Sequence, residues 1–206
     1  ALGLELGVDY ISLSFVREAA DIAQLRAQLA SAERPPKVIA KIEDQYAVAH
    51  VDEIIAVADA VMVARGDLGV ECPFEDLPIL QRRIVRACQL AGKPVIVATH
   101  MLESMTGEPM PTRAEVTDVA NAVYEQADAI MLSSETSVGE FPERSVDAMD
   151  RIARRMEREP AASFHAAAVL EDSRQKIAKA AVGMADDLAA AAIIVFTREG
   201  RMVPEV

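Results

Sequence analysis

The stretch Ala60-Val-Met-Val-Ala-Arg-Gly-Asp-Leu-Gly69 places five apolar residues directly before a charged segment flanked by glycines. An apolar run without polar alternation is typical of a strand covered on both faces, as in parallel sheets. The change from apolar to charged residues marks the carboxyl end of that strand. The stretch therefore predicts a buried parallel strand that ends in charged residues at one edge of a sheet.

Four further apolar runs of the same character lie on both sides of this stretch. Each ends in polar or charged residues, and apolar residues at helical steps of three and four lie between the runs. The runs start roughly 30 residues apart, which is the length of a βα unit. The five predicted strands cover Tyr10–Phe15, Val38–Ile42, Ala60–Ala64, Val95–Thr99 and Ala129–Leu132.

Boundary signals support the helices between these strands. Thr112-Arg-Ala-Glu115 is a capping box, in which the threonine and glutamate side chains satisfy backbone amides at a helix start. Pro142 suits the first turn of another helix, where its missing N–H costs nothing. Gly92 and Pro94 follow an apolar helical stripe and predict a helix end there.

Parallel strands joined by helices fit two architectures, a (β/α)8 TIM barrel or a doubly wound open sheet. Five units are too few for a complete barrel. The pattern loosens after Pro160, so a domain boundary is predicted near residues 159–163. A helix over Glu171–Leu188 and a strand over Ala192–Thr197 are expected beyond it, in roughly 40 residues that are too few to bury a core alone.

The composition indicates a globular chain that does not bind polyanions. The 206 residues include 33 acidic and 21 basic side chains, giving a formal net charge of −12. This charge repels nucleic acid and anionic lipid, and no apolar run approaches the ~20 residues of a membrane span. Cys72 and Cys88 match neither a zinc spacing nor a disulfide framework, which favours the reducing cytoplasm. The chain begins with Ala1 and reads as the interior of a longer protein, without a signal peptide.

Charged residues follow consecutive predicted strands at their carboxyl ends, where parallel α/β folds carry their sites. Lys41 and Glu43 are two residues apart and share a face of their strand, and Asp67 follows the neighbouring strand. Because adjacent strands lie about 4.8 Å apart, Glu43 and Asp67 could ligate one Mg²⁺ together with water and substrate oxygens. Lys41 beside this cation would stabilise a developing negative oxygen, as on an enolate or a transferring phosphoryl group.

Further polar residues at the strand ends have both a structural and a functional interpretation. Gly66 and Gly69 permit a turn whose amides point at an anion, and plain turn geometry also explains them. Thr99 is placed to hydrogen-bond a substrate carboxylate or to cap a helix. Ser133 and Glu135 could hold water or a ligand, and the Ser-x-Glu pattern is also common at helix starts.

Seven motifs extend this pattern along the chain: Ile39-Ala-Lys-Ile-Glu43, Met62-Val-Ala-Arg-Gly-Asp-Leu-Gly-Val-Glu71, Lys93-Pro-Val-Ile-Val-Ala-Thr99, Met101-Leu-Glu-Ser-Met105, Pro111-Thr-Arg-Ala-Glu115, Asp118-Val-Ala-Asn-Ala-Val123 and Met131-Leu-Ser-Ser-Glu-Thr136. In this order they resemble the signatures of the pyruvate kinase family. The resemblance is strong over roughly residues 3–160 and weak over residues 161–206. His100 and Ser134 depart from it, since the family usually has Gln at the first position and many members have Gly at the second.

The resemblance implies a fold and a reaction. Residues 1–160 would supply strands four to eight of a (β/α)8 TIM barrel, and residues 161–206 would begin a C-terminal α/β domain. The family transfers phosphate from phosphoenolpyruvate to ADP, giving pyruvate and ATP, with Mg²⁺ (or Mn²⁺) and K⁺. It forms cytoplasmic homotetramers without nucleic-acid or membrane partners. The family's K⁺ ligands and most of its nucleotide contacts fall outside this chain, so we expect the chain alone not to turn over.

The resemblance also implies roles for the charged residues of the site. Lys41 would be the catalytic lysine that stabilises the phosphoryl group in flight and the enolate. Glu43 and Asp67 would ligate the Mg²⁺. Gly66 and Asp67, through their backbone amides, and Thr99 would hold the substrate carboxylate.

Other residues receive implied roles at the rim of the site or away from it. Ser14 and Phe15 would line the substrate pocket. Ser133 and Glu135 would order the water through which the enolate is protonated. Arg113 would lie at a subunit interface.

Two other functions fit the residues without the resemblance. A Mg²⁺-dependent barrel lyase or aldolase that acts on pyruvate needs the same two carboxylates but no nucleotide. A non-catalytic remnant that serves as an interaction module needs none of them. The retention of Lys41, Glu43 and Asp67 in phase argues against the second alternative.

Overall fold

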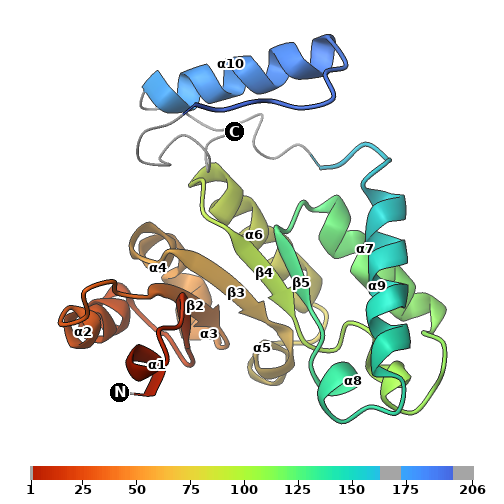
Figure 1. Cartoon of the computed structure of the whole chain (residues 1–206). Helices are drawn as coiled ribbons and strands as arrows, with labels where there is room; N and C mark the ends of the chain where they lie inside the picture. The colour runs from red at the N-terminus through yellow and green to blue at the C-terminus, as the bar shows by residue number, and fades with distance from the viewer. Residues whose placement is uncertain (1, 163–172, 197–206) are drawn as a thin grey trace. The chain divides into compact units, whose positions relative to one another are not determined.

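Five parallel strands form one sheet in the N-terminal part of the chain (Figure 1). The strands pair in chain order, and Lys41 lies opposite Met62 in the register between the second and third strands. A doubly wound sheet reverses its strand order at a switch point, and this sheet does not. The strands are β1 (Tyr10–Leu13), β2 (Lys37–Ile42), β3 (Ala60–Ala64), β4 (Val95–Ala98) and β5 (Ala129–Met131).

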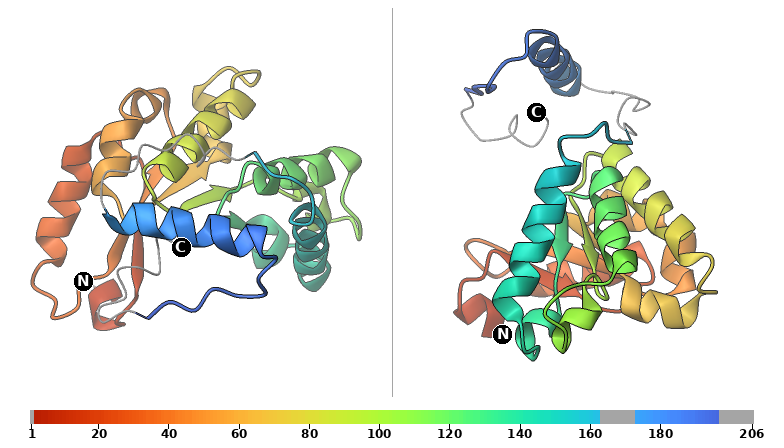
Figure 2. Two further views of the ribbon diagram at one scale, coloured as in Figure 1. Left: turned by 90° about the horizontal axis from the view of Figure 1, so that it is seen from above. Right: turned by 90° about the vertical axis from the view of Figure 1, so that its right-hand side faces the viewer.

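Helices connect the strands and pack on the sheet. Figure 2 shows the larger helices α2, α4, α6 and α7 arranged around one side of the sheet, which is how helices surround a barrel. The helices of this part are α1 (Leu2–Glu5), α2 (Ala19–Leu29), α3 (Gln45–Ala49), α4 (Val51–Val57), α5 (Arg65–Glu71), α6 (Leu77–Leu90), the 3₁₀ helix η1 (Glu103–Thr106), α7 (Arg113–Tyr124), α8 (Ser134–Ser137) and α9 (Pro142–Met156).

This computed structural model describes residues 2–162 and 173–196. The chain divides into two compact units, Ala1–His165 and Ala166–Val206. The second unit contains α10 (Ser173–Asp187), which confirms the predicted helix within the described residues. None of the described helices is both long and apolar enough to cross a membrane.

The strand predicted over Ala192–Thr197 is wrong for the part that the structure describes. Residues 192–196 have no strand or helix assignment, and Thr197 lies outside the described residues. The side chains of Ile194 and Phe196 are largely exposed. A strand needs a paired neighbour to satisfy its backbone groups, and this segment has none among the described residues.

The burial pattern of the strands corrects the expectation that every strand is covered on both faces. All five residues of β3 are buried, as predicted. Strand β2 instead alternates, with Val38, Ala40 and Ile42 fully buried and Ile39 and Lys41 partly exposed. The difference follows the strand order, because β3 is the middle strand of the sheet and β2 lies one strand from its edge.

Three predicted strands continue too far at the edge that carries the charged residues. Strand β1 ends at Leu13, β4 at Ala98 and β5 at Met131, before the predicted ends Phe15, Thr99 and Leu132. Phe15 has φ 54° and Thr99 has φ 69°. This left-handed backbone turns the chain out of the sheet. The predicted capping box at Thr112 and the helix start at Pro142 are confirmed.

Candidate active site

The predicted site residues gather at the carboxyl edge of the sheet because every strand ends there. Lys41 is the second-last residue of β2, and Glu43 follows that strand. Gly66 and Asp67 lie in the first turn of α5, directly after β3. The remaining edge residues follow the other strands: Ser14 and Phe15 after β1, Thr99 after β4, and Ser133 and Glu135 after β5.

Lys41 and Glu43 form an ion pair at the end of β2, with 2.5 Å between Lys41 Nζ and Glu43 Oε1. The Lys41 ammonium also donates to Ser14 Oγ at 3.0 Å. The other oxygen, Glu43 Oε2, accepts a hydrogen bond from the Phe15 backbone N–H. The Glu43 side chain is 1% exposed and the Lys41 side chain 23%. A carboxylate this deeply buried needs such partners, because an unpaired buried charge costs several kcal/mol.

Glu43 Oε1 is buried, and the Lys41 ammonium is its partner among the described residues. This leaves an anionic oxygen with coordination capacity at the site. Asp67 is exposed in the first turn of the helix after the neighbouring strand. Among residues 2–162 and 173–196 no group of three or more His, Cys, Asp or Glu side chains could hold a metal. Carboxylate oxygens are the ligands that Mg²⁺ takes in proteins, with water and substrate oxygens in its other positions, so Glu43 and Asp67 are the residues whose chemistry fits this cation.

Thr99 and Gly66 are joined across the ends of β4 and β3. The Gly66 N–H donates to Thr99 Oγ1 at 2.6 Å, and the Thr99 hydroxyl donates to the Ala98 carbonyl at 2.7 Å. Amides in the first turn of a helix have no partner within the helix, and the N-cap residue of α5, Ala64, provides no side-chain cap. The Thr99 hydroxyl thus satisfies the Gly66 amide that the resemblance assigns to substrate.

Glu135 is fully buried and faces backbone amides. Its Oε1 accepts from the Leu102 N–H at 3.0 Å and its Oε2 from the Ser133 N–H at 2.7 Å. The carboxylate thereby ties the end of β5 to the loop that follows β4. In this arrangement Glu135 fixes the position of Ser133.

Arg65 is a buried residue of this edge that the sequence did not single out. Its side chain is 6% exposed, its Nη1 lies 2.7 Å from Asp118 Oδ2, and its guanidinium donates to the carbonyls of Thr99 and His100. Its position in the sequence was the available signal. Arg65 is a charged residue that directly follows a fully apolar strand, at the point where the buried core ends.

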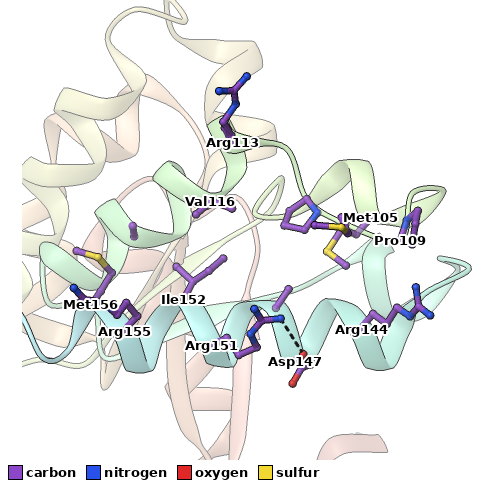
Figure 3. A pocket seen from close by; sticks show the side chains of 14 residues that line it. Met105, Pro109, Arg113, Val116, Arg144, Asp147, Arg151, Ile152, Arg155 and Met156 are labelled. Carbon is purple, nitrogen blue, oxygen red and sulfur yellow. Dashed lines mark ion pairs between the residues drawn. The ribbon is translucent and has the colours of Figure 1, made fainter.

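Arg113 lies away from the edge residues and lines a groove of about 770 Å³ between α7 and α9 (Figure 3). The apolar side chains of Met105, Val116, Ile152 and Met156 line the same groove. None of the predicted catalytic, substrate or metal residues contributes to it. Helices α7 and α9 lie side by side here in Figures 1 and 2.

The two cysteines have thiols that resist ionisation. Burial raises the pKa of Cys88 to about 12, and the negative charge of Asp128 adds to the rise. Burial also raises the pKa of Cys72, with the nearby Asp76 acting in the same direction. A thiolate is the reactive form of cysteine, so neither residue is suited to nucleophilic chemistry.

Comparison with known proteins identifies relatives over nearly the whole chain. The family model "Pyruvate kinase, barrel domain" matches residues 1–146. The chain is 46% identical over 198 residues to pyruvate kinase 2 of Synechocystis sp., covering 96% of this chain and 34% of that relative. It is 48% identical over 208 residues to pyruvate kinase PKLR of Homo sapiens, covering 97% of this chain and 36% of that relative. A crystal structure of a pyruvate kinase from Cryptosporidium parvum matches with a TM-score of 0.93 and 38% sequence identity, over 98% of this chain and 44% of that chain.

The chain spans about a third of the length of these two curated relatives. The matched family model includes every strand of the sheet and each of the edge residues from Ser14 to Glu135. Fold, edge residues and relatives agree. This chain belongs to the pyruvate kinase family.

Proposed function

We propose that this chain carries the phosphoenolpyruvate and Mg²⁺ half of a pyruvate kinase active site. The whole enzyme would transfer the phosphoryl group of phosphoenolpyruvate to ADP, giving pyruvate and ATP. The observation that carries the proposal is the Lys41–Glu43 pair, in which a buried carboxylate and a partly exposed ammonium meet at the carboxyl edge of the sheet. Such an arrangement suits a cation and a negatively charged substrate better than a purely structural ion pair.

Glu43 and Asp67 would hold the Mg²⁺, which when bound supplies positive charge for the substrate oxygens. The Lys41 ammonium, held by Ser14, stabilises the negative charge that develops on the transferring phosphoryl group and the enolate oxygen. When the substrate carboxylate binds, it replaces Thr99 Oγ1 as the acceptor of the Gly66 amide and the Ala98 carbonyl as the acceptor of the Thr99 hydroxyl, with Ser14 and Phe15 beside it. Ser133, positioned by Glu135, orders the water that gives its proton to the enolate carbon.

The family's architecture supplies further proposals about this chain. By the resemblance to the family, strands β1–β5 correspond to strands four to eight of the barrel, and their chain-order pairing is that of consecutive barrel strands. Residues 1–160 belong to the barrel, and residues 161–206 begin the C-terminal α/β domain. Arg113 belongs to a subunit interface of a homotetramer in the cytoplasm. K⁺ joins Mg²⁺ as the second cation, with its ligands on other parts of the enzyme.

Binding of Mn²⁺ and phosphoenolpyruvate tests the proposal on the 206-residue chain itself. Water-proton relaxation reports Mn²⁺ binding, and we expect Glu43→Gln and Asp67→Asn each to weaken it by about tenfold or more, since the loss of even an outer-shell partner of a ligand costs that much. Glu71→Gln is the matched control, since Glu71 is an exposed carboxylate at the other end of α5. Equal Mn²⁺ affinity in all four proteins would contradict the proposal.

A coupled assay with phosphoenolpyruvate, ADP, Mg²⁺ and K⁺ tests the activity of the chain alone. We expect no turnover, because the chain spans about a third of the length of relatives that carry the complete site. Turnover that Lys41→Ala abolishes would show instead that these residues suffice. Cleavage of an aldol substrate to pyruvate without ADP would favour a Mg²⁺-dependent lyase.

A further inference from the structure

Thr99 and His100 are consecutive residues with left-handed backbone, at φ 69° and 52°. Residues with a Cβ avoid this conformation, and a β-branched residue such as threonine does so most strongly. The surrounding structure must therefore hold the turn in place. The Thr99 hydroxyl on this turn meets the Gly66 amide at 2.6 Å.

Arg65 holds both carbonyls of this turn. Its Nε and Nη2 donate to the Thr99 carbonyl at 3.1 and 2.8 Å, and Nη2 also donates to the His100 carbonyl at 2.9 Å. Because the guanidinium is planar and rigid, three donated hydrogen bonds from one fork fix the orientation of two successive peptide groups. Because Arg65 directly precedes Gly66 in the chain, it connects the turn to the segment that carries the Gly66 amide.

The Arg65 guanidinium is itself held from two helices. Asp118 of α7 pairs with Nη1 at 2.7 Å, and Gln81 of α6 accepts from the same nitrogen at 3.4 Å. Gln81 in turn donates to the fully buried carboxylate of Glu125 at 2.9 Å. This chain of contacts holds the Arg65 guanidinium in one orientation, with Nε and Nη2 toward the carbonyls of the turn.

We propose that Arg65 is a positioning residue that holds the left-handed Thr99–His100 turn so that the Thr99 hydroxyl and the Gly66 amide lie side by side, where a substrate carboxylate can replace their present acceptors. The inference rests on the proposed function, in which these two groups bind the substrate carboxylate. Arg65 acts through the turn, and the proposal gives it no contact with the substrate. Asp118 sets the orientation of Arg65 in the same way.

The test compares Arg65→Lys and Asp118→Asn with the control Arg26→Lys in the 206-residue chain. Lysine keeps the charge of Arg65 but lacks the fork, and asparagine keeps the shape of Asp118 but lacks its charge. Arg26 pairs with Asp59 at 2.7 Å, and its contacts lie outside the chain of contacts that holds Arg65. Hydrogen exchange of the Gly66 amide, followed by NMR, reports its bond to Thr99 directly. The dissociation constants of Mn²⁺ alone and of phosphoenolpyruvate with Mn²⁺ report the site.

We expect Arg65→Lys to speed Gly66 exchange and to weaken phosphoenolpyruvate binding by about tenfold each, whereas the affinity for Mn²⁺ alone changes by less than about twofold. Asp118→Asn should give a smaller change in the same direction, and Arg26→Lys none. Unchanged Gly66 exchange in a folded Arg65→Lys protein would overturn the inference. An equal change in Arg26→Lys would also overturn it, because the effect would then be a general loss of stability.

Two further outcomes are also decisive. If Arg65→Lys does not fold, Asp118→Asn decides, with faster Gly66 exchange supporting the inference and unchanged exchange overturning it. If the unmodified chain binds no phosphoenolpyruvate, the proposed function fails, while the exchange of Gly66 still supports or overturns the role of Arg65.

Discussion

At the scale of single residues, Glu43 is a buried charged side chain whose contacts belong both to the site and to the fold. Its carboxylate is buried at the edge of the sheet, with the Phe15 amide on one oxygen and the Lys41 ammonium beside the other. Removing one partner from a buried ion pair leaves an uncompensated charge, which destabilises a fold more than the pair stabilises it. The same contacts that organise the site therefore also contribute to folding.

Replacing Lys41 tests this coupling of site and stability. We expect Lys41→Met to lower the free energy of unfolding by about 3 kcal/mol, since Glu43 stays buried without its countercharge. Adding Glu43→Gln should recover part of this loss, as measured by urea unfolding in a double-mutant cycle. Lys37→Met is the control, because Lys37 is an exposed residue of the same strand, with its ammonium 5.6 Å from the Tyr10 ring. A loss as large in the control as in Lys41→Met would refute the prediction.

Glu115 gives a pH-dependent prediction. Burial acts to raise the pKa of Glu115, but hydrogen bonds from Ser104 and Thr112 outweigh it and leave the pKa below the ordinary value of 4.5. A carboxyl whose pKa is lowered by folding stabilises the fold above its unfolded pKa, and this contribution disappears as pH falls through the lowered value.

We expect Glu115→Gln to lower the free energy of unfolding by about 1–2 kcal/mol at pH 7, because the neutral amide supports the capping box less well. The difference from the unmodified chain should shrink at pH values below 4.5. Urea unfolding at pH 7 and at acid pH measures it, with the exposed Glu108→Gln as control. A difference that stays constant with pH would show that the charge of Glu115 is not responsible.

At the scale of elements, the apolar runs identified all five strands and their order along the chain. Apolar runs report burial, so they found the strands to within a few residues. They could not show where the backbone turns left-handed, and the strands ending in Phe15 and Thr99 were therefore predicted too long. The roles of Arg65 and Glu135 depend on partners that lie about 30 residues away in the chain. Only the fold brings those partners together.

The contact between α8 and η1 depends on the absence of a side chain at Gly139. A Cβ at this position would lie 2.5 Å from the Glu135 carbonyl oxygen and 3.2 Å from the Thr106 Cα. Both are backbone atoms, so a methyl group forces the two segments apart. Gly139 also donates its N–H to the Ser134 carbonyl at 2.9 Å, which closes the end of α8.

We expect Gly139→Ala to lower the free energy of unfolding by about 2–3 kcal/mol, the usual cost of overpacking. Gly107→Ala is the matched control, because a Cβ there meets nothing within 4 Å. The control should change stability by less than about 0.5 kcal/mol. Urea denaturation of both variants measures the difference, and equal stabilities would mean that the segments move apart without cost.

At the scale of the whole molecule, the two units contribute unequally to the described core. The buried apolar cluster extends from Val16 to Met149 and lies entirely within the first unit. The sequence predicted a boundary near residues 159–163 from the loosened pattern after Pro160. Because the described core lies within the first unit, the free energy of unfolding of a shortened chain tests that boundary.

Ending the chain after residue 162 should leave the first unit folded. We expect the free energy of unfolding to change by less than about 1 kcal/mol, since burial of apolar surface dominates stability and the described core stays complete. Urea unfolding of the shortened and full chains, monitored by circular dichroism, measures this change. A loss of several kcal/mol would assign the segment after residue 162 an essential part in the fold.

The chain-order pairing of β1 to β5 also governs how the sheet can be assembled. Each strand finds its neighbour one βα unit away, so no pairing waits for a distant segment and the entropy of loop closure stays low. Synthesis proceeds from the N-terminus at about 5–20 residues per second. Each newly synthesised unit can therefore dock on the edge that the preceding strand presents, and the sheet can grow strand by strand during translation.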